Sequence, residues 1–219
     1  MSDIAQDAME LPPQPSPFRL VGTLGGIAVL SGLLVVMTYQ WTKPAIERNQ
    51  REALERAVFS VLPGAVRSEP VEMTGQTVFA GFDEADRRIG FALESEARGY
   101  QDVVRILYGF DPDRQKIIGM TVLQSTETPG LGDKIIRDPA FHANFEALDV
   151  SREVEVVKSG AKTEAWQIDG ISGATVSSQA VGQAIRRGAE LRERVLAFYR
   201  GDQTNRTDQT NLTERGGQP

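Results

Sequence analysis

The sequence of 219 residues contains no cysteine and one histidine. Without thiolates and with one imidazole, it lacks the ligands of iron–sulfur clusters, the attachment site of c-type haem and the ligands of most zinc sites. The histidine, His142, lies in a short amphipathic stretch, where a packing role is commoner than that of a catalytic base. No metal site is expected, and a redox function would need an organic cofactor.

The sequence also lacks a stripe of basic residues. It holds 24 Lys and Arg against 30 Asp and Glu, for a net charge of −6. Nucleic-acid binding depends on clustered Lys and Arg that displace counterions from phosphates. We therefore expect no nucleic-acid partner. The length is sufficient for one globular domain with additional segments.

One long run, residues 20–40, is free of charge and mostly apolar. Its length is that of a helix that crosses a bilayer, and Tyr39 and Trp41 provide interfacial aromatics at one end. A buried soluble helix would need a larger domain around it. A cleaved signal peptide fits less well, because the apolar run is too long and no small-x-small cleavage site precedes Trp41. The run predicts a retained transmembrane helix.

The charges that flank this run predict its orientation poorly. Arg19 is the one basic residue before it, whereas four follow closely: Lys43, Arg48, Arg51 and Arg56. Counted alone, these residues favour a cytoplasmic C-terminal side.

The remaining sequence divides into four further segments. Residues 1–19 are polar and proline-rich, which predicts a flexible tail, and residues 41–63 have the spacing of an amphipathic stalk helix. Residues 64–200 form the expected domain. Residues 201–219 are polar and predict a disordered tail.

Within the domain, the pattern predicts an α+β fold with a mainly antiparallel sheet and flanking helices. A hairpin is expected around the turn residues Asp111-Pro112-Asp113-Arg114. The expected strands are 89–94, 102–110, 116–124 and 153–158, and the expected helices are 138–148 and 175–199.

The run Ser172-Gly173-Ala174-Thr175 lies where a loop becomes the second of these helices. The first turn of a helix offers unpaired N–H groups and the positive end of the helix dipole, which together bind anions. Gly173 allows close approach of a phosphate, and Ala174 leaves room beside it. From the residues alone, an ordinary N-cap at Ser172 or Thr175, with Gly173 as a turn residue, is the commoner explanation of this pattern. A P-loop is excluded, because the Gly-Lys-Ser/Thr ending is absent.

The longer string from Asp169 to Ser177 resembles the flavinylation motif of FMN-binding domains, in which the threonine carries FMN through a phosphodiester bond. A second string, Ser125-Thr126-Glu127-Thr128-Pro129-Gly130-Leu131-Gly132, is similar to the loop of the same domain that packs near the isoalloxazine ring. Two motifs in the expected order are far more specific than either one.

The resemblance implies a role for each matched residue. Thr175 is the tether for covalent FMN, and no catalytic residue is expected beyond the flavin. The remaining residues are Ser172, Gly173, Ala174 and Ser177 for a phosphate cradle, and Glu127, Thr128 and Leu131 for the surroundings of the ring. A threonine without a base is a poor nucleophile. The family accordingly uses a Mg-dependent flavin transferase, which would be a partner.

The layout of one span followed by one such domain is similar to the G subunit of the Rnf ion-translocating electron transport complex. This likeness implies a bacterial inner-membrane protein with a periplasmic domain, assembled with other membrane and peripheral subunits. The complex couples electron transfer between ferredoxin and NAD to ion translocation. Three alternatives stay open: the related C subunit of Na⁺-translocating NADH:quinone reductase, a cofactor-free anchored scaffold, and a flavoprotein reductase with a soluble acceptor.

Overall fold

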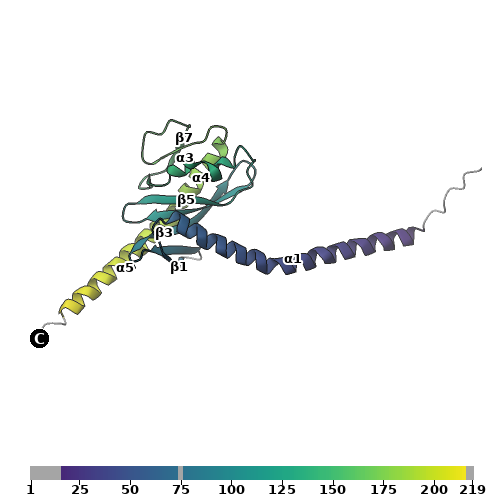
Figure 1. Ribbon diagram of the computed structural model, residues 1–219, viewed down its shortest axis with the longest axis horizontal. Helices are drawn as coiled ribbons and strands as arrows, with labels where there is room; N and C mark the ends of the chain where they lie inside the picture. The colour runs from purple at the N-terminus through teal and green to yellow at the C-terminus, as the bar shows by residue number, and fades with distance from the viewer. Residues whose placement is uncertain (1–15, 74–75, 216–219) are drawn as a thin grey trace, which may run out of the picture. The chain divides into compact units, whose positions relative to one another are not determined.

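The computed structural model describes residues 16–73 and 76–215, and the chain divides into two units between Arg51 and Glu52. Most of the predicted N-terminal tail lies outside the described residues. The described part contains a long N-terminal helix, an antiparallel sheet and flanking helices, labelled in Figure 1. This arrangement confirms the predicted α+β class.

The N-terminal helix, α1 (Pro17–Val61), includes the apolar run, which is long and apolar enough to cross a membrane. The side chains of this run are exposed. Three threonine hydroxyls donate back to carbonyls of the preceding turn: Thr23 at 2.6 Å, and Thr38 and Thr42 at 2.8 Å. These three hydroxyls are thus paired with the backbone of their own helix, which suits a hydrocarbon environment. Helix α1 begins at Pro17, within the segment predicted as a tail.

Six antiparallel strands form the main sheet, and each pairs with the next along the chain. They are β1 (Arg67–Met73), β2 (Gln76–Phe82), β3 (Arg88–Arg98), β4 (Val103–Asp111), β5 (Lys116–Gln124) and β6 (Leu148–Asp149). The predicted hairpin is β4 and β5, and the Asp111 carboxylate accepts from the N–H groups of Asp113 and Arg114 in its turn. Strands β1, β2 and β6 were not predicted; the side chains of β1 are mostly exposed and polar, and β6 is only two residues long.

A second, two-stranded sheet pairs β7 (Glu155–Val157) with β8 (Gln167–Asp169) in parallel. The strand predicted at 153–158 is thus shorter than expected. The helices beside it are α2 (Lys134–Arg137) and α3 (Pro139–Ala143). The helix predicted at 138–148 ends early because the Asn144 amide donates to the carbonyls of Phe141 (3.0 Å) and Asp169 (3.2 Å).

The long helix predicted at 175–199 consists of two helices, α4 (Thr175–Arg187) and α5 (Ala189–Arg215). The Arg192 guanidinium donates to the Ile185 carbonyl at 2.6 Å, an acceptor that residue 189 would use in a continuous α-helix. Helix α5 continues to Arg215, in contrast to the disordered tail predicted from residue 201. No proline interrupts it, and Asp202 pairs with Arg88 at 2.9 Å.

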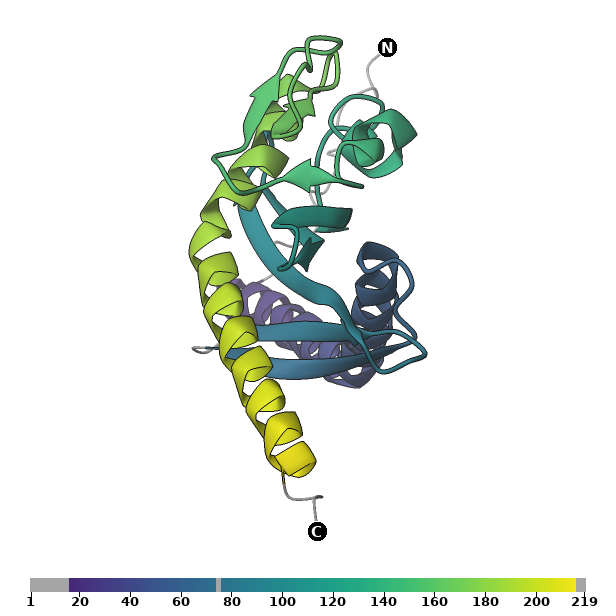
Figure 2. The ribbon, with the colours of Figure 1, turned by 90° about the vertical axis from the view of Figure 1, so that its left-hand side faces the viewer.

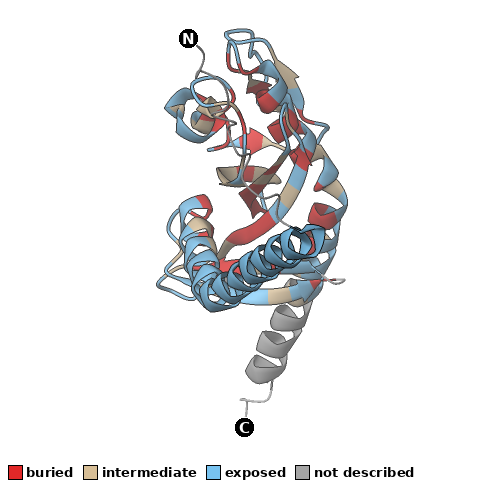
Figure 3. Ribbon diagram, turned by 90° about the vertical axis from the view of Figure 1, so that its right-hand side faces the viewer, coloured by how far each residue is buried: buried red, intermediate tan, exposed pale blue. Residues whose placement is uncertain are grey.

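The main core lies between one face of the sheet and helices α4 and α5, which Figure 2 shows running along the sheet. Residues of β4 alternate between the two faces, with Ile106, Tyr108 and Phe110 toward this core and Leu107 toward the other face. Burial raises the pKa of Tyr108, whose hydroxyl accepts from Arg192 at 3.2 Å. The buried positions are red in Figure 3.

The opposite face of the sheet receives the end of α1 in a smaller core. Val58, Val61 and Leu62 are buried there against Ala92 and Leu107. Glycines at facing positions of the strands permit the close approach: a Cβ on Gly109 would lie 1.9 Å from the Val61 carbonyl oxygen. The end of the stalk helix is therefore part of the domain fold.

We predict that Gly109→Ala lowers the free energy of unfolding of the domain by at least about 1 kcal/mol, because the added methyl group overlaps the backbone of α1. Denaturant unfolding of the full chain in detergent measures the change. The matched control is Gly201→Ala in α5, where a Cβ meets no atom within 4 Å. The control should leave stability unchanged or raise it by up to about 1 kcal/mol, since alanine favours helix. Equal stability of the two variants would contradict the packing argument.

Candidate functional site

The two sequence motifs meet around one cavity of about 460 Å³. Its lining comprises Tyr100, Glu127, Thr128, Leu131, Gly132, Gly173, Ala174, Thr175, Val176 and Ser177. The fold thus brings together the loop after β5 and the first turn of α4. All of the predicted site residues line this cavity except one. Ser172 is exposed and lines a neighbouring cavity of about 550 Å³.

The first turn of α4 carries no side-chain cap. Its N-cap position is occupied by Ala174 (φ −129°, ψ 34°), whose methyl group cannot accept a hydrogen bond. The alternative interpretation, with Ser172 or Thr175 as an ordinary N-cap, therefore does not describe this helix. The N–H groups of the first turn keep their capacity to bind an anion. Gly173 precedes the turn with φ +82°, a conformation that favours glycine.

Three hydroxyl groups lie in this turn, and only that of Thr175 is on an exposed residue. Ser177 is 2% exposed and donates to Oε2 of Glu127 at 2.5 Å. Ser178 is fully buried, donates to the Ala174 carbonyl at 2.9 Å and accepts from the N–H of Ile171 at 3.1 Å. Of the three, the Thr175 hydroxyl is the one that a modifying enzyme can reach.

The Glu127 side chain connects three segments of the site. Its Oε1 accepts from the N–H groups of Tyr100 (2.9 Å) and Gln101 (3.1 Å) in the turn between β3 and β4. Its Oε2 accepts from Ser177 in α4. These bonds compensate the burial of a residue that is only 6% exposed. The resemblance to FMN-binding domains assigned Glu127 to the surroundings of the isoalloxazine ring. It did not indicate that Glu127 connects three segments.

Three of the large side chains that line the cavity are exposed. Leu131 is 52% exposed, Val176 is 47% exposed and Tyr100 is 71% exposed. Thr128 lies between the segments and accepts from the Gln101 amide at 2.8 Å. Sequence reasoning missed Tyr100, because it lies outside both motifs, and an aromatic residue beside Gly99 is too weak a signal by itself.

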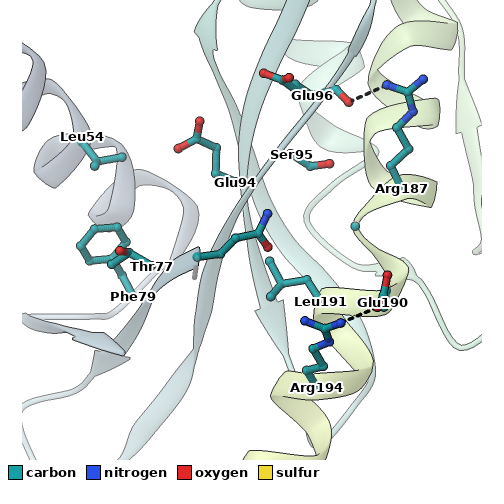
Figure 4. Close-up of a pocket in the computed structure, with 12 residues that line it drawn as sticks. Leu54, Thr77, Phe79, Glu94, Ser95, Glu96, Arg187, Glu190, Leu191 and Arg194 are labelled. Atoms are coloured by element: carbon teal, nitrogen blue, oxygen red, sulfur yellow. Dashed lines mark hydrogen bonds and ion pairs between the residues drawn. The ribbon is translucent and has the colours of Figure 1, made fainter. Parts of the chain in front are cut away.

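A larger cavity of about 760 Å³ lies elsewhere in the domain and contains none of the motif residues. Figure 4 shows its mixture of apolar and charged side chains, among them Leu54, Glu94 and Arg187. Its arginines have partners: Arg194 pairs with Glu190 at 2.5 Å, and Arg187 donates to the Glu96 carbonyl at 3.4 Å. It offers no exposed hydroxyl at a helix start, so we do not assign the chemistry to it.

Metal chemistry finds no support among the described residues, where no group of three or more His, Cys, Asp or Glu could hold an ion. His142 is half-buried in α3, and its ring nitrogens face the carbonyls of Met120 (3.2 Å) and Ile136 (3.1 Å). This position fits the packing role expected from the sequence.

Comparisons with known proteins agree with this geometry. Residues 99–190 match the family model described as FMN-binding domain, and residues 17–61 match the RnfG N-terminal region. The G subunit of the ion-translocating oxidoreductase complex of Methanosarcina acetivorans is 31% identical over 182 residues, covering 78% of this chain and 92% of that protein. The G subunit of the proton-translocating ferredoxin:NAD(+) oxidoreductase complex of Clostridium ljungdahlii is 24% identical, covering 81% and 92%.

Among solved structures, the C subunit of the Na(+)-translocating NADH-quinone reductase of Parabacteroides distasonis has the same fold. The TM-score is 0.53 at 19% identity, covering 68% of this chain and 94% of that chain. The chain therefore belongs to the family of G subunits of the ion-translocating oxidoreductase complexes, and it contains an FMN-binding domain.

Proposed function

We propose that this protein is the electron-transferring G subunit of an Rnf-type complex and carries FMN through a phosphodiester bond to Thr175. One observation carries the proposal: the exposed Thr175 hydroxyl lies in the uncapped first turn of α4, beside a cavity that both motif loops line. The neighbouring hydroxyls of Ser177 and Ser178 are buried and engaged.

The residues present suit this cofactor. The first-turn N–H groups would hold the phosphate, with Gly173 and Ala174 beside it. Leu131 and Val176 would contact the ring, and Thr128 with Glu127 would keep their loop in place. When bound, FMN supplies reversible electron transfer, while the protein positions it and sets its surroundings.

Attachment of the flavin requires a second protein. The one carboxylate in the cavity, that of Glu127, is occupied by Ser177 and two backbone N–H groups, so it does not serve Thr175 as a base. A threonine without a base is a poor nucleophile. We infer that a flavin transferase modifies Thr175, which its exposure permits.

At the level of the complex, we propose that the protein passes electrons between other subunits and has no independent substrate turnover. Relatives are named as subunits of ion-translocating complexes, and one name specifies ferredoxin and NAD(+). The fold is shared with the C subunit of the quinone reductase. The match of residues 17–61 to the RnfG N-terminal region favours a G subunit over that alternative.

For location, we propose that α1 anchors the protein in a bacterial inner membrane with the FMN-binding domain in the periplasm. The length and apolar surface of α1 support the anchor. The periplasmic location is taken from the family resemblance, although the basic residues that flank the span favour the cytoplasm. We give the resemblance more weight because partner subunits can orient a single span.

We predict that Thr175→Ala abolishes covalent flavin while leaving the fold intact, since the side chain is exposed and its loss should change stability by about 0.5 kcal/mol or less. Full-length protein from cells that contain the flavin transferase is denatured and separated by gel electrophoresis. Flavin fluorescence of the band and intact mass are then measured.

The control is Thr163→Ala, which removes an exposed threonine hydroxyl that does not line the cavity and should retain the flavin. A wild-type band without fluorescence or the added mass of FMN minus water would disprove the carrier function and favour a cofactor-free scaffold. Fluorescence that persists in Thr175→Ala would show that FMN is attached to another residue.

The orientation can be tested cleanly, because the chain contains no cysteine. We predict that Ala161→Cys, in an exposed loop of the domain, reacts with a membrane-impermeant maleimide in spheroplasts. Ser16→Cys, before the span, should react only after permeabilisation. The reverse pattern would place the domain in the cytoplasm, as the basic residues after the span suggest.

A further inference from the structure

Tyr100 is the most exposed large apolar side chain of the cavity, at 71%. With Leu131 and Val176 it places three large, exposed apolar side chains around one opening. Exposed apolar groups that gather in one place indicate a contact surface. The Thr175 hydroxyl lies in the same lining, so a group attached there would meet these side chains.

The backbone of Tyr100 is fixed although its ring is exposed. Its N–H and that of Gln101 both donate to Oε1 of Glu127, and the Gln101 amide donates to the Thr128 hydroxyl. The Gly99 N–H closes the turn on the Asp102 carbonyl at 2.8 Å. The same carboxylate accepts from Ser177 in α4, so Glu127 connects the turn to the helix that carries Thr175.

Two considerations favour an aromatic ligand beside the phenol ring of Tyr100. Glu127 is the only charged residue in the lining, and its carboxylate is engaged. Flat aromatic systems prefer stacked or edge-to-face contacts with a tyrosine ring. The family match also begins at residue 99, so this turn belongs to the FMN-binding domain.

We propose that Tyr100 forms one wall of the flavin site and packs its phenol ring against the isoalloxazine of the FMN on Thr175. The proposal rests on the function proposed above. It assigns to a residue outside both motifs the role of positioning the flavin and shielding it from water.

Contact with a phenol has an optical consequence. An excited flavin accepts one electron from a touching tyrosine, and the electron returns to the phenol in the dark, which leaves both groups unchanged and quenches the fluorescence. Tryptophan does the same, whereas phenylalanine and leucine are not electron donors to flavin. Fluorescence per flavin therefore reports this contact independently of any electron transfer by the complex.

The experiment uses the full-length flavinylated protein in detergent. Fluorescence per flavin is measured in the native state and again after unfolding in guanidinium. Wild type should be quenched in the native state and brighten severalfold on unfolding. Tyr100→Leu and Tyr100→Phe should be bright in both states, and Tyr100→Trp should restore the quenching.

The matched control is Tyr199→Phe, which also removes one phenol hydroxyl. Tyr199 bonds to Asp113, beyond the far end of β4, and nine strand residues place that turn about 30 Å from Tyr100. Its native fluorescence should equal that of wild type. Equal native fluorescence in wild type and Tyr100→Leu overturns the proposal. A Tyr199→Phe protein that is as bright as Tyr100→Leu in the native state overturns it too.

Failure of the underlying function would look different. If FMN is not attached to Thr175, the wild-type band in the denaturing gel is dark, or the Thr175→Ala band stays fluorescent. If only the Tyr100 proposal fails, every Tyr100 variant carries the gel-stable flavin and its native fluorescence matches that of wild type.

Discussion

The buried carboxylate of Glu127 is the constraint on which the site depends. It joins the turn between β3 and β4, the loop after β5 and the first turn of α4, three segments that no regular sheet or helix hydrogen bonds connect at this point. A carboxylate is costly to bury, and removing its partners would leave that cost uncompensated. Each segment therefore helps to keep the other two in place, and the site has a defined geometry although its side chains are partly exposed.

Close packing reinforces this connection. A Cβ on Gly132 would lie 2.6 Å from Oε2 of Glu127, and one on Gly99 would lie 2.4 Å from Oε1. Both loops thus press their backbones against the carboxylate. The rest of the domain serves as a platform, because β3 and β4 contact α4 on one face of the sheet and the end of α1 on the other.

A covalent tether suits a cavity of this kind. The lining is apolar at its rim, exposed, and provides one charged group that is already engaged. Such a surface offers few polar anchors for a free nucleotide, whereas specific cofactor sites bury most of their ligand. Attachment to Thr175 would hold the cofactor at high effective concentration without deep burial. The flavin edge could then stay accessible to electron-transfer partners.

The sequence predicted the elements whose signal is local. The apolar run, the β4–β5 hairpin and the start of α4 at Thr175 follow from hydrophobic periodicity and turn residues. The two motifs contain nine of the ten residues that line the cavity, and seven of these had an assigned role. Elements that depend on hydrogen bonds to a neighbouring element were missed or misjudged. Strand β1 depends on its partner β2, and the division of α4 from α5 depends on Arg192 reaching Ile185.

The sequence by itself determined that this protein has an apolar helix, an α+β domain and a threonine at a helix start within a flavinylation-like motif. Only the tertiary structure decided that Ala174 leaves the helix uncapped, that Ser177 and Ser178 are engaged, and that Tyr100 belongs to the site. The physical reason is that burial and proximity depend on atoms far apart in the chain, while the folded backbone decides which residue occupies the N-cap position. Glu127 and Ser177 are 50 residues apart, and only the fold brings them within hydrogen-bonding distance.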